Sequence, residues 1–200
     1  MILKRHALVY LNEYCSPIPT KHDDVFLDWI QKGYPLIYTR QPIDIVNDHL
    51  QLGIPKFCQK MAIKQRYIFC VCQDAISKVC PLPSWNCIMP NDRCEMNPFV
   101  YGSFAWEYIT QTPYITPQSD LDLFFIYKKY SLNQLLKTIQ SIQEIKKYRI
   151  DGEIRFEPWG DCSILELLFT DTVQLLFKQE QGMHLVNRRD LYDRFPTLLS

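Results

Sequence analysis

Two acidic residues at the start of an apolar run are the first candidates for chemistry in this 200-residue chain. Asp120 precedes the run "LDLFFIY" (121–127), and Asp122 lies within it. The run is predicted to be a strand, and residues i and i+2 of a strand project from the same face. Two carboxylates held so close repel each other unless a cation lies between them, and Mg²⁺ favours such oxygen ligands. The spacing favours an Mg²⁺ site; a pair of solvated acids at a strand end is the equally common alternative.

A Gly-Ser pair, Gly102 and Ser103, lies ahead of these acids. Glycine allows a ligand to approach the backbone closely. Ser103 is predicted to cap a helix over "FAWEYIT" (104–110), whose unpaired N–H groups would face an anion. A helix N-terminus beside a metal site suits a phosphate ligand. The simpler interpretation is that Ser103 is only an N-cap and Gly102 only a turn residue.

A third acid is expected on a second strand. In "RIDGEIRF" (149–156), Asp151 and Glu153 share a face by the same two-residue spacing. A helix from N-cap Ser131 to about Lys147 is long enough to bring this strand beside residues 121–127. Asp151 is the first choice for the third acid and Glu153 the alternative, although an acid before a glycine is also common in turns.

The remaining elements are predicted from apolar and β-branched runs. Strands are expected at 34–42 and 60–72, with a turn-rich segment at 44–57 between them. Residues 162–169 form a helix or a strand, and residues 172–178 a further strand. Four prolines between 81 and 98 interrupt regular structure, so the domain boundary is predicted there, with domains at 1–88 and 89–200.

Composition restricts the class of protein and its partners. Lys and Arg number 22, equal to Asp and Glu, so no nucleic-acid or membrane partner is expected. No segment has the length of a signal-peptide core or a membrane helix, which predicts a cytoplasmic protein. The eight cysteines are therefore expected to be reduced thiols.

The string "YGSFAWEYITQTPYITPQSDLDL" resembles the nucleotidyltransferase superfamily that includes the palm of DNA polymerase β. It is most similar to one branch, the phosphoribosyl-dephospho-CoA transferase of malonate decarboxylase, also called malonate decarboxylase holo-acyl-carrier-protein synthase. "GYPLIYTRQP", "LGIPKF", "KQRYIFCV" and "DGEIRFEPWGDCSILELL" extend the similarity over nearly the whole chain. The resemblance implies an α+β protein, with a small β-rich N-terminal domain before a polymerase-β-like nucleotidyltransferase domain of mixed sheet and helices.

The resemblance also implies a reaction. The family transfers the phosphoribosyl-dephospho-CoA prosthetic group from 2'-(5''-triphosphoribosyl)-3'-dephospho-CoA to a serine of the malonate decarboxylase acyl carrier protein, and pyrophosphate is released. Asp120 and Asp122 would hold Mg²⁺, and Asp151 would complete the metal site or take the proton. Gly102 and Ser103 would bind the departing phosphates.

Two further residues have roles implied only by the resemblance. Trp106 would line the nucleotide pocket, although an aromatic residue on a helix is more often part of the core. Lys178 would meet a phosphate, with a solvated lysine at a strand end as the alternative.

Two other functions fit the same residues. The first is a nucleotidyltransferase that uses ATP or another nucleoside triphosphate on a small-molecule or protein acceptor, because the metal acids do not choose the acceptor. The second is an inactive nucleotide-binding module, against which the intact "GS" and "DLD" argue.

Overall fold

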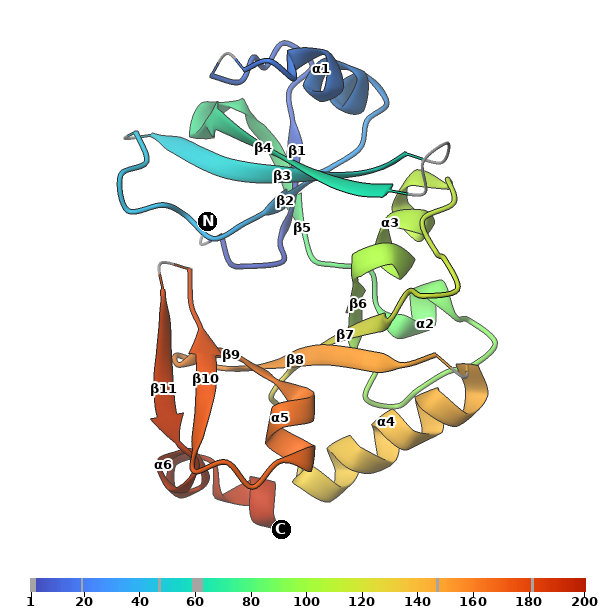
Figure 1. The fold of residues 1–200 in the computed structure, drawn as a ribbon, viewed down its shortest axis with the longest axis vertical. Coiled ribbons are helices and arrows are strands. Elements are labelled where there is room, and N and C mark those ends of the chain that lie inside the picture. Colours follow the sequence, from blue (N-terminus) through green and yellow to red (C-terminus); the bar gives the residue numbers. More distant parts are fainter. Residues whose placement is uncertain (1–2, 19, 47, 59–62, 147, 181) are drawn as a thin grey trace. The chain divides into compact units, whose positions relative to one another are not determined.

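The computed structural model describes residues 3–18, 20–46, 48–58, 63–146, 148–180 and 182–200 (Figure 1). The chain divides into two compact units. The first comprises Met1–Leu82 and Ile109–Tyr114, and the second Pro83–Tyr108 and Ile115–Ser200. Residues 83–88, which the sequence assigned to the first domain, lie in the second unit. Among the described residues, no helix is both long and apolar enough to span a membrane.

In its described residues, the first unit is a five-stranded antiparallel sheet with one α-helix, in strand order β4-β3-β2-β1-β5. Its elements are β1 (Leu8–Leu11), α1 (Asp23–Gln31), β2 (Leu36–Tyr38), β3 (His49–Cys58), β4 (Ile63–Cys72), the 3₁₀ turn η1 (Gln73–Ala75) and β5 (Ile76–Cys80). The predicted β-rich N-terminal region is therefore confirmed. The helix α1 packs on the sheet through Phe26, whose ring centroid lies 5.0 Å from that of Phe69.

The turn-rich prediction for 44–57 is wrong, because the ten-residue strand β3 begins at His49. Leu50, Leu52 and Ile54 alternate along it and are buried. Pro55 lies within this strand although proline has no N–H to donate. However, β2 pairs with β3 only at Gly53 and Leu52, so the proline lies beyond the end of β2, where the ladder does not need that donor.

The second unit is built on a six-stranded mixed sheet in the order β11-β10-β9-β8-β7-β6. Its strands are β6 (Phe99–Tyr101), β7 (Leu121–Ile126), β8 (Ile150–Phe156), β9 (Gly160–Ser163), β10 (Gln174–Lys178) and β11 (Met183–Asn187). Its helices are α2 (Trp85–Ile88), α3 (Gly102–Thr110), α4 (Leu132–Lys146), α5 (Ile164–Phe169), α6 (Arg188–Arg194) and the 3₁₀ turn η2 (Pro196–Leu199). The α+β class is confirmed. Of the helix and the strand predicted as alternatives for residues 162–169, the helix α5 is observed from Ile164 onward.

The segment β7–α4–β8 forms the predicted crossover between two parallel strands. Its helix begins after Ser131, whose Oγ accepts from the Gln134 N–H at 3.2 Å while Gln134 Oε1 accepts from the Ser131 N–H at 2.9 Å. This reciprocal pair satisfies two donors at the helix end. Leu135, Ile139 and Ile142 face the core at helical spacing. In Figure 1, α4 and α5 lie on the same side of the sheet.

The two faces of this sheet differ in chemistry. Leu121, Leu123 and Phe125 of β7 belong to the core formed with α4 and α5. Because side chains alternate along a strand, Asp122 and Phe124 project from the opposite face. The charged residues of the neighbouring strands occupy that same face, so the chemistry of the second unit is concentrated on the side away from α4.

Arg188 joins the C-terminal elements. Its guanidinium donates to the carbonyl oxygens of Leu167 (2.8 Å), Glu166 (3.1 Å), Thr170 (2.9 Å) and Thr172 (3.0 Å). These include carbonyls of the last turn of α5 that lack a helical partner. The arginine thus fixes the end of α5 before β10.

Gly152 permits the close pairing of β7 and β8. A Cβ at this position would lie 2.2 Å from the Leu123 carbonyl oxygen, a backbone atom that cannot rotate away. We expect Gly152→Ala to lower the free energy of unfolding of the second unit by about 1–3 kcal/mol or more. Gly182→Ala is the control, because nothing lies within 4 Å of a Cβ there. Urea denaturation followed by tryptophan fluorescence measures both, and equal stabilities would contradict the close approach.

Candidate active site

Strands β6 and β7 bring the Gly-Ser pair to the predicted metal acids. Tyr101, the last residue of β6, pairs with Asp122 of β7. The next residue, Gly102, has φ +65°, a conformation that favours glycine. A Cβ on Gly102 would lie 1.8 Å from Asp122 Oδ2 and 2.8 Å from its Cγ. The Asp122 carboxylate therefore packs directly against the glycine backbone, in space that no other residue type leaves open.

Ser103 follows in the first turn of α3, which begins at Gly102. The helix therefore begins one residue before Ser103, the residue predicted to cap it. Its side chain is buried, with 8% exposure. The N-terminal amides of a helix have no partner within the helix, so this end of α3 supplies N–H donors beside Asp122.

Asp120, immediately before β7, is paired with a cation. Arg149 Nε lies 2.6 Å from Asp120 Oδ1, and one terminal nitrogen lies 2.5 Å from Oδ2. The hydrogen bond with Asp120 and its negative charge raise the pKa of Arg149, and the charge of Asp151 adds to this. Because Arg149 is 79% exposed, this bidentate pair is accessible to solvent and to a competing ion.

Asp151 occupies the expected place on β8. It is in register with Asp122 across the parallel β7–β8 pair, so the two side chains lie on the same face of the sheet. Asp151 is exposed, and its Oδ1 accepts from the Gly152 N–H at 2.7 Å. Adjacent strands are about 4.8 Å apart, which brings two negative charges close together.

The three acids are near one another without forming a closed carboxylate cluster. Among the described residues, the carboxylate oxygens of Asp120, Asp122 and Asp151 do not all lie within 4.8 Å of one another, since Asp120 is turned to Arg149. Asp122 and Asp151, which are in register on one face of the sheet, and Asp120, two residues before Asp122, are a suitable donor set for a divalent cation. Full coordination by all three requires Asp120 to release Arg149.

Glu153, the alternative third acid, is engaged elsewhere. Its Oε1 lies 2.6 Å from Lys178 Nζ, and its side chain is only 7% exposed. Lys178, predicted to meet a phosphate or to be a solvated lysine, is therefore in an ion pair, although 38% of its side chain remains exposed.

Trp106 is buried, with 5% exposure.

A second ion pair beside the site was not found from the sequence. Arg155 of β8 makes a bidentate contact with Asp161 of β9, at 2.6 and 2.8 Å, and both side chains are buried. The Arg155 guanidinium also lies 4.8 Å from the centroid of the Phe124 ring. Burial lowers the pKa of Arg155, but the hydrogen bond with Asp161 and its charge raise it above its usual value overall. The charged residues at 151, 153 and 155 alternate along β8, and this pattern could have placed Arg155 on the same face of the sheet as Asp151.

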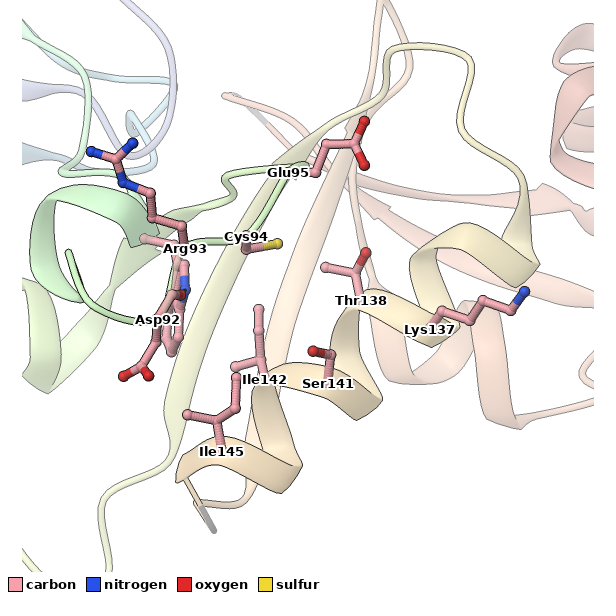
Figure 2. Close-up of a pocket in the computed structure, with 10 residues that line it drawn as sticks. Asp92, Arg93, Cys94, Glu95, Lys137, Thr138, Ser141, Ile142 and Ile145 are labelled. Atoms are coloured by element: carbon pink, nitrogen blue, oxygen red, sulfur yellow. Dashed lines mark hydrogen bonds between the residues drawn. The ribbon is translucent and has the colours of Figure 1, made fainter.

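A separate pocket of about 230 Å³ lies between α4 and the segment 92–95 (Figure 2). Thr138, Ser141 and Ile142 of α4 line it opposite Cys94, whereas Lys137 points away from them in Figure 2. Because α4 covers the face of the sheet away from the acids, this pocket is distinct from the acid site.

The fold and these side chains define a two-unit α+β protein with an acid-bearing sheet face beside a helix N-terminus. The family model described as the phosphoribosyl-dephospho-CoA transferase MdcG C-terminal domain matches residues 82–189. The model described as the N-terminal domain of the same transferase matches residues 4–82. The chain therefore belongs to the phosphoribosyl-dephospho-CoA transferase MdcG family, which confirms the resemblance seen in the sequence.

Curated relatives agree with this assignment. A phosphoribosyl-dephospho-CoA transferase of Xanthomonas axonopodis pv. citri (strain 306) is 26% identical over 206 residues, which cover 94% of this chain and 96% of the relative. The protein of the same name from Xanthomonas campestris pv. campestris (strain 8004) is also 26% identical, with the same coverage. One from Bradyrhizobium diazoefficiens is 34% identical over 63 residues, or 31% of this chain and 28% of the relative. No solved structure matches the chain significantly.

None of the eight cysteines forms a disulfide, as predicted. Cys162, next to Asp161, is fully buried, and burial raises the pKa of its thiol far above the usual value, with the negative charge of Glu166 adding to this. A thiol that stays protonated at neutral pH is a poor nucleophile.

We expect iodoacetamide at pH 8 to alkylate the exposed Cys87 in the native protein and to leave Cys162 unmodified. In urea, where the burial is lost, both thiols should react. Peptide mass spectrometry measures the modification at each site. Modification of Cys162 in the native protein at the rate of Cys87 would contradict its burial.

Proposed function

We propose that this chain transfers a phosphoribosyl-dephospho-CoA unit from 2'-(5''-triphosphoribosyl)-3'-dephospho-CoA to a serine of an acyl carrier protein, with release of pyrophosphate. The family match over residues 4–189 supports the transferred group. The acceptor is the carrier protein subunit of malonate decarboxylase, and the reaction takes place in the cytoplasm. We further infer that the second unit is a polymerase-β-like nucleotidyltransferase domain.

One structural observation supports the proposal. The Asp122 carboxylate is packed against Gly102, at the start of α3, and is in register with Asp151. Phosphoryl transfer requires positive charge at the phosphate oxygens and donors for the leaving phosphates. An acidic pair that attracts a divalent cation and a helix end that offers N–H groups supply both within a few residues.

Asp120 and Asp122, with Asp151, would hold Mg²⁺, for which their carboxylates are suitable ligands. A bound Mg²⁺ would neutralise negative charge on the phosphoryl oxygens. Arg149, now paired with Asp120, is exposed enough to move away when Asp120 turns toward the metal site.

The reaction replaces a phosphoanhydride bond of the donor with a phosphodiester bond to the carrier protein. The acceptor serine oxygen forms a bond to the α-phosphorus, and the bond from this phosphorus to the oxygen bridging it to the β-phosphate breaks. The electron pair leaves with pyrophosphate. The serine hydroxyl proton passes to Asp151 where this exposed acid acts as the general base and not as the third metal ligand, since the two roles are alternatives. The backbone N–H groups at Gly102 and Ser103 bind the departing phosphates, and the exposed part of Lys178 offers them an ammonium.

The direct test combines the purified protein, Mg²⁺, the labelled donor and the apo carrier protein. Transfer of label to the carrier protein serine is expected, and Asp120→Asn or Asp122→Asn should reduce its rate by roughly a hundredfold or more. Asp193→Asn, which changes an exposed acid of α6, should retain the rate. Transfer from ATP or another nucleoside triphosphate but not from the CoA-derived donor would replace the proposed substrate, and full activity of both site variants would place the chemistry elsewhere.

Gly102→Ala tests the contact between the glycine and Asp122. The added Cβ would force the carboxylate to rotate away, so we expect a loss of transfer of at least tenfold. Gly33→Ala is a matched control, because Gly33 also has a positive φ (+71°) but nothing within 4 Å of a Cβ. Both variants should lose about 1–2 kcal/mol of stability from the left-handed backbone. Equal transfer rates in the two variants would argue against the placement of Asp122.

A further inference from the structure

The acid-bearing face of the second sheet continues from the acids toward its other edge. Register places Asp122 beside Asp151 and Phe124 beside Glu153, so Glu153 follows Asp151 on the same face. On β10, Leu175 and Phe177 face the core, which turns Lys178 to the face of the acids. A cation and a carboxylate therefore lie next to the proposed metal acids.

The Lys178 ammonium reaches across a strand to its partner. Lys178 is on β10 and Glu153 on β8, with β9 between them, so their backbones are roughly 10 Å apart. Even so, Nζ lies 2.6 Å from Glu153 Oε1. The side chain thus extends inward over the sheet, and its charged end is held roughly 7 Å along β8 from the position of Asp151.

Asp161 is closer to Lys178 in the sheet than Glu153 is, but its carboxylate is already paired with Arg155. Asp161 of β9 is directly paired with Lys178 in the sheet ladder. Both of its carboxylate oxygens, however, accept from Arg155, which is itself fixed against the Phe124 ring. The buried Arg155–Asp161 pair leaves Glu153 as the carboxylate that contacts Lys178, and so determines where the ammonium lies.

We propose that Glu153 is a positioning residue, which holds the Lys178 ammonium at the place where it contacts a phosphate of the donor. This inference rests on the proposed function. Lys178 has three N–H donors and keeps 38% of its side chain exposed, so it can donate to Glu153 and to a phosphate oxygen together. Glu153 itself is buried and acts through the lysine.

The test is a double-mutant cycle of Glu153→Gln, Lys178→Met and the double variant. For each protein, calorimetry measures the binding of inorganic tripolyphosphate in the presence of Mg²⁺. Lys178→Met should weaken binding roughly tenfold or more, because a charged hydrogen bond is lost. Glu153→Gln should weaken it by a smaller factor, and the double variant should bind as weakly as Lys178→Met does, neither more weakly nor more tightly. Lys128→Met, which removes an exposed lysine of the same unit, should bind as the unchanged protein does.

If the Glu153–Lys178 ion pair only stabilised the fold, the double-mutant cycle would give a different pattern of binding. Lys178→Met leaves a buried carboxylate uncompensated, and the double variant removes that charge, so structural damage would be repaired in the double variant. Recovery of tripolyphosphate binding in the double variant, additive losses, or unchanged binding in Glu153→Gln would each overturn the inference. Thermal melts of all variants identify any that fail to fold, and Lys178→Arg, which keeps the charge, should retain most of the binding.

Kinetics separate this inference from the proposed function. In the transfer reaction, Glu153→Gln should raise the KM for the donor and leave the KM for the carrier protein unchanged. If the unchanged protein transfers no label but the binding cycle behaves as expected, the proposed function fails and the phosphate contact stands. If transfer occurs and Glu153→Gln matches the unchanged protein in both assays, the positioning role fails and the proposed function stands.

Discussion

The repulsion between two carboxylates on neighbouring strands is the constraint around which the second unit is organised. Parallel pairing of β7 with β8 places Asp122 opposite Asp151, and the close approach of Gly152 to the Leu123 carbonyl keeps the strands in that register. The backbones of the two residues cannot be separated without breaking the ladder. The nearby groups respond to this charge: Arg149 pairs with Asp120, and the first turn of α3 is directed at Asp122.

The hydrophobic core makes this arrangement stable. Leu121, Leu123 and Phe125 of β7 pack in the core with α4 and α5, so the alternation of the strand places Asp122 on the opposite face, with the charged residues of the neighbouring strands. The ion pairs Arg155–Asp161 and Glu153–Lys178 lie on that face with little exposure of their acids. Their charges compensate each other locally, in a place where an isolated charge would be costly.

Local patterns predicted the elements that carry the site. The apolar run at 121–127, the capping residue Ser131 and the alternation in 149–156 each correspond to an observed element, because the local signal and the buried face agree. Prediction failed where a neighbour decides the outcome. Pro55 is accommodated in β3 because β2 ends before it.

The sequence by itself determined the class of the fold, the family and the two-residue spacing of the acids, since these depend on residue types and their order along the chain. Only the tertiary structure decided which charges meet. Arg149 with Asp120, Lys178 with Glu153, and Arg155 with Asp161 are chosen by strand order and register, which bring together residues 6 to 29 positions apart. Hydrophobic alternation specifies the face on which a side chain lies, but the partner on that face is set by which strands pair.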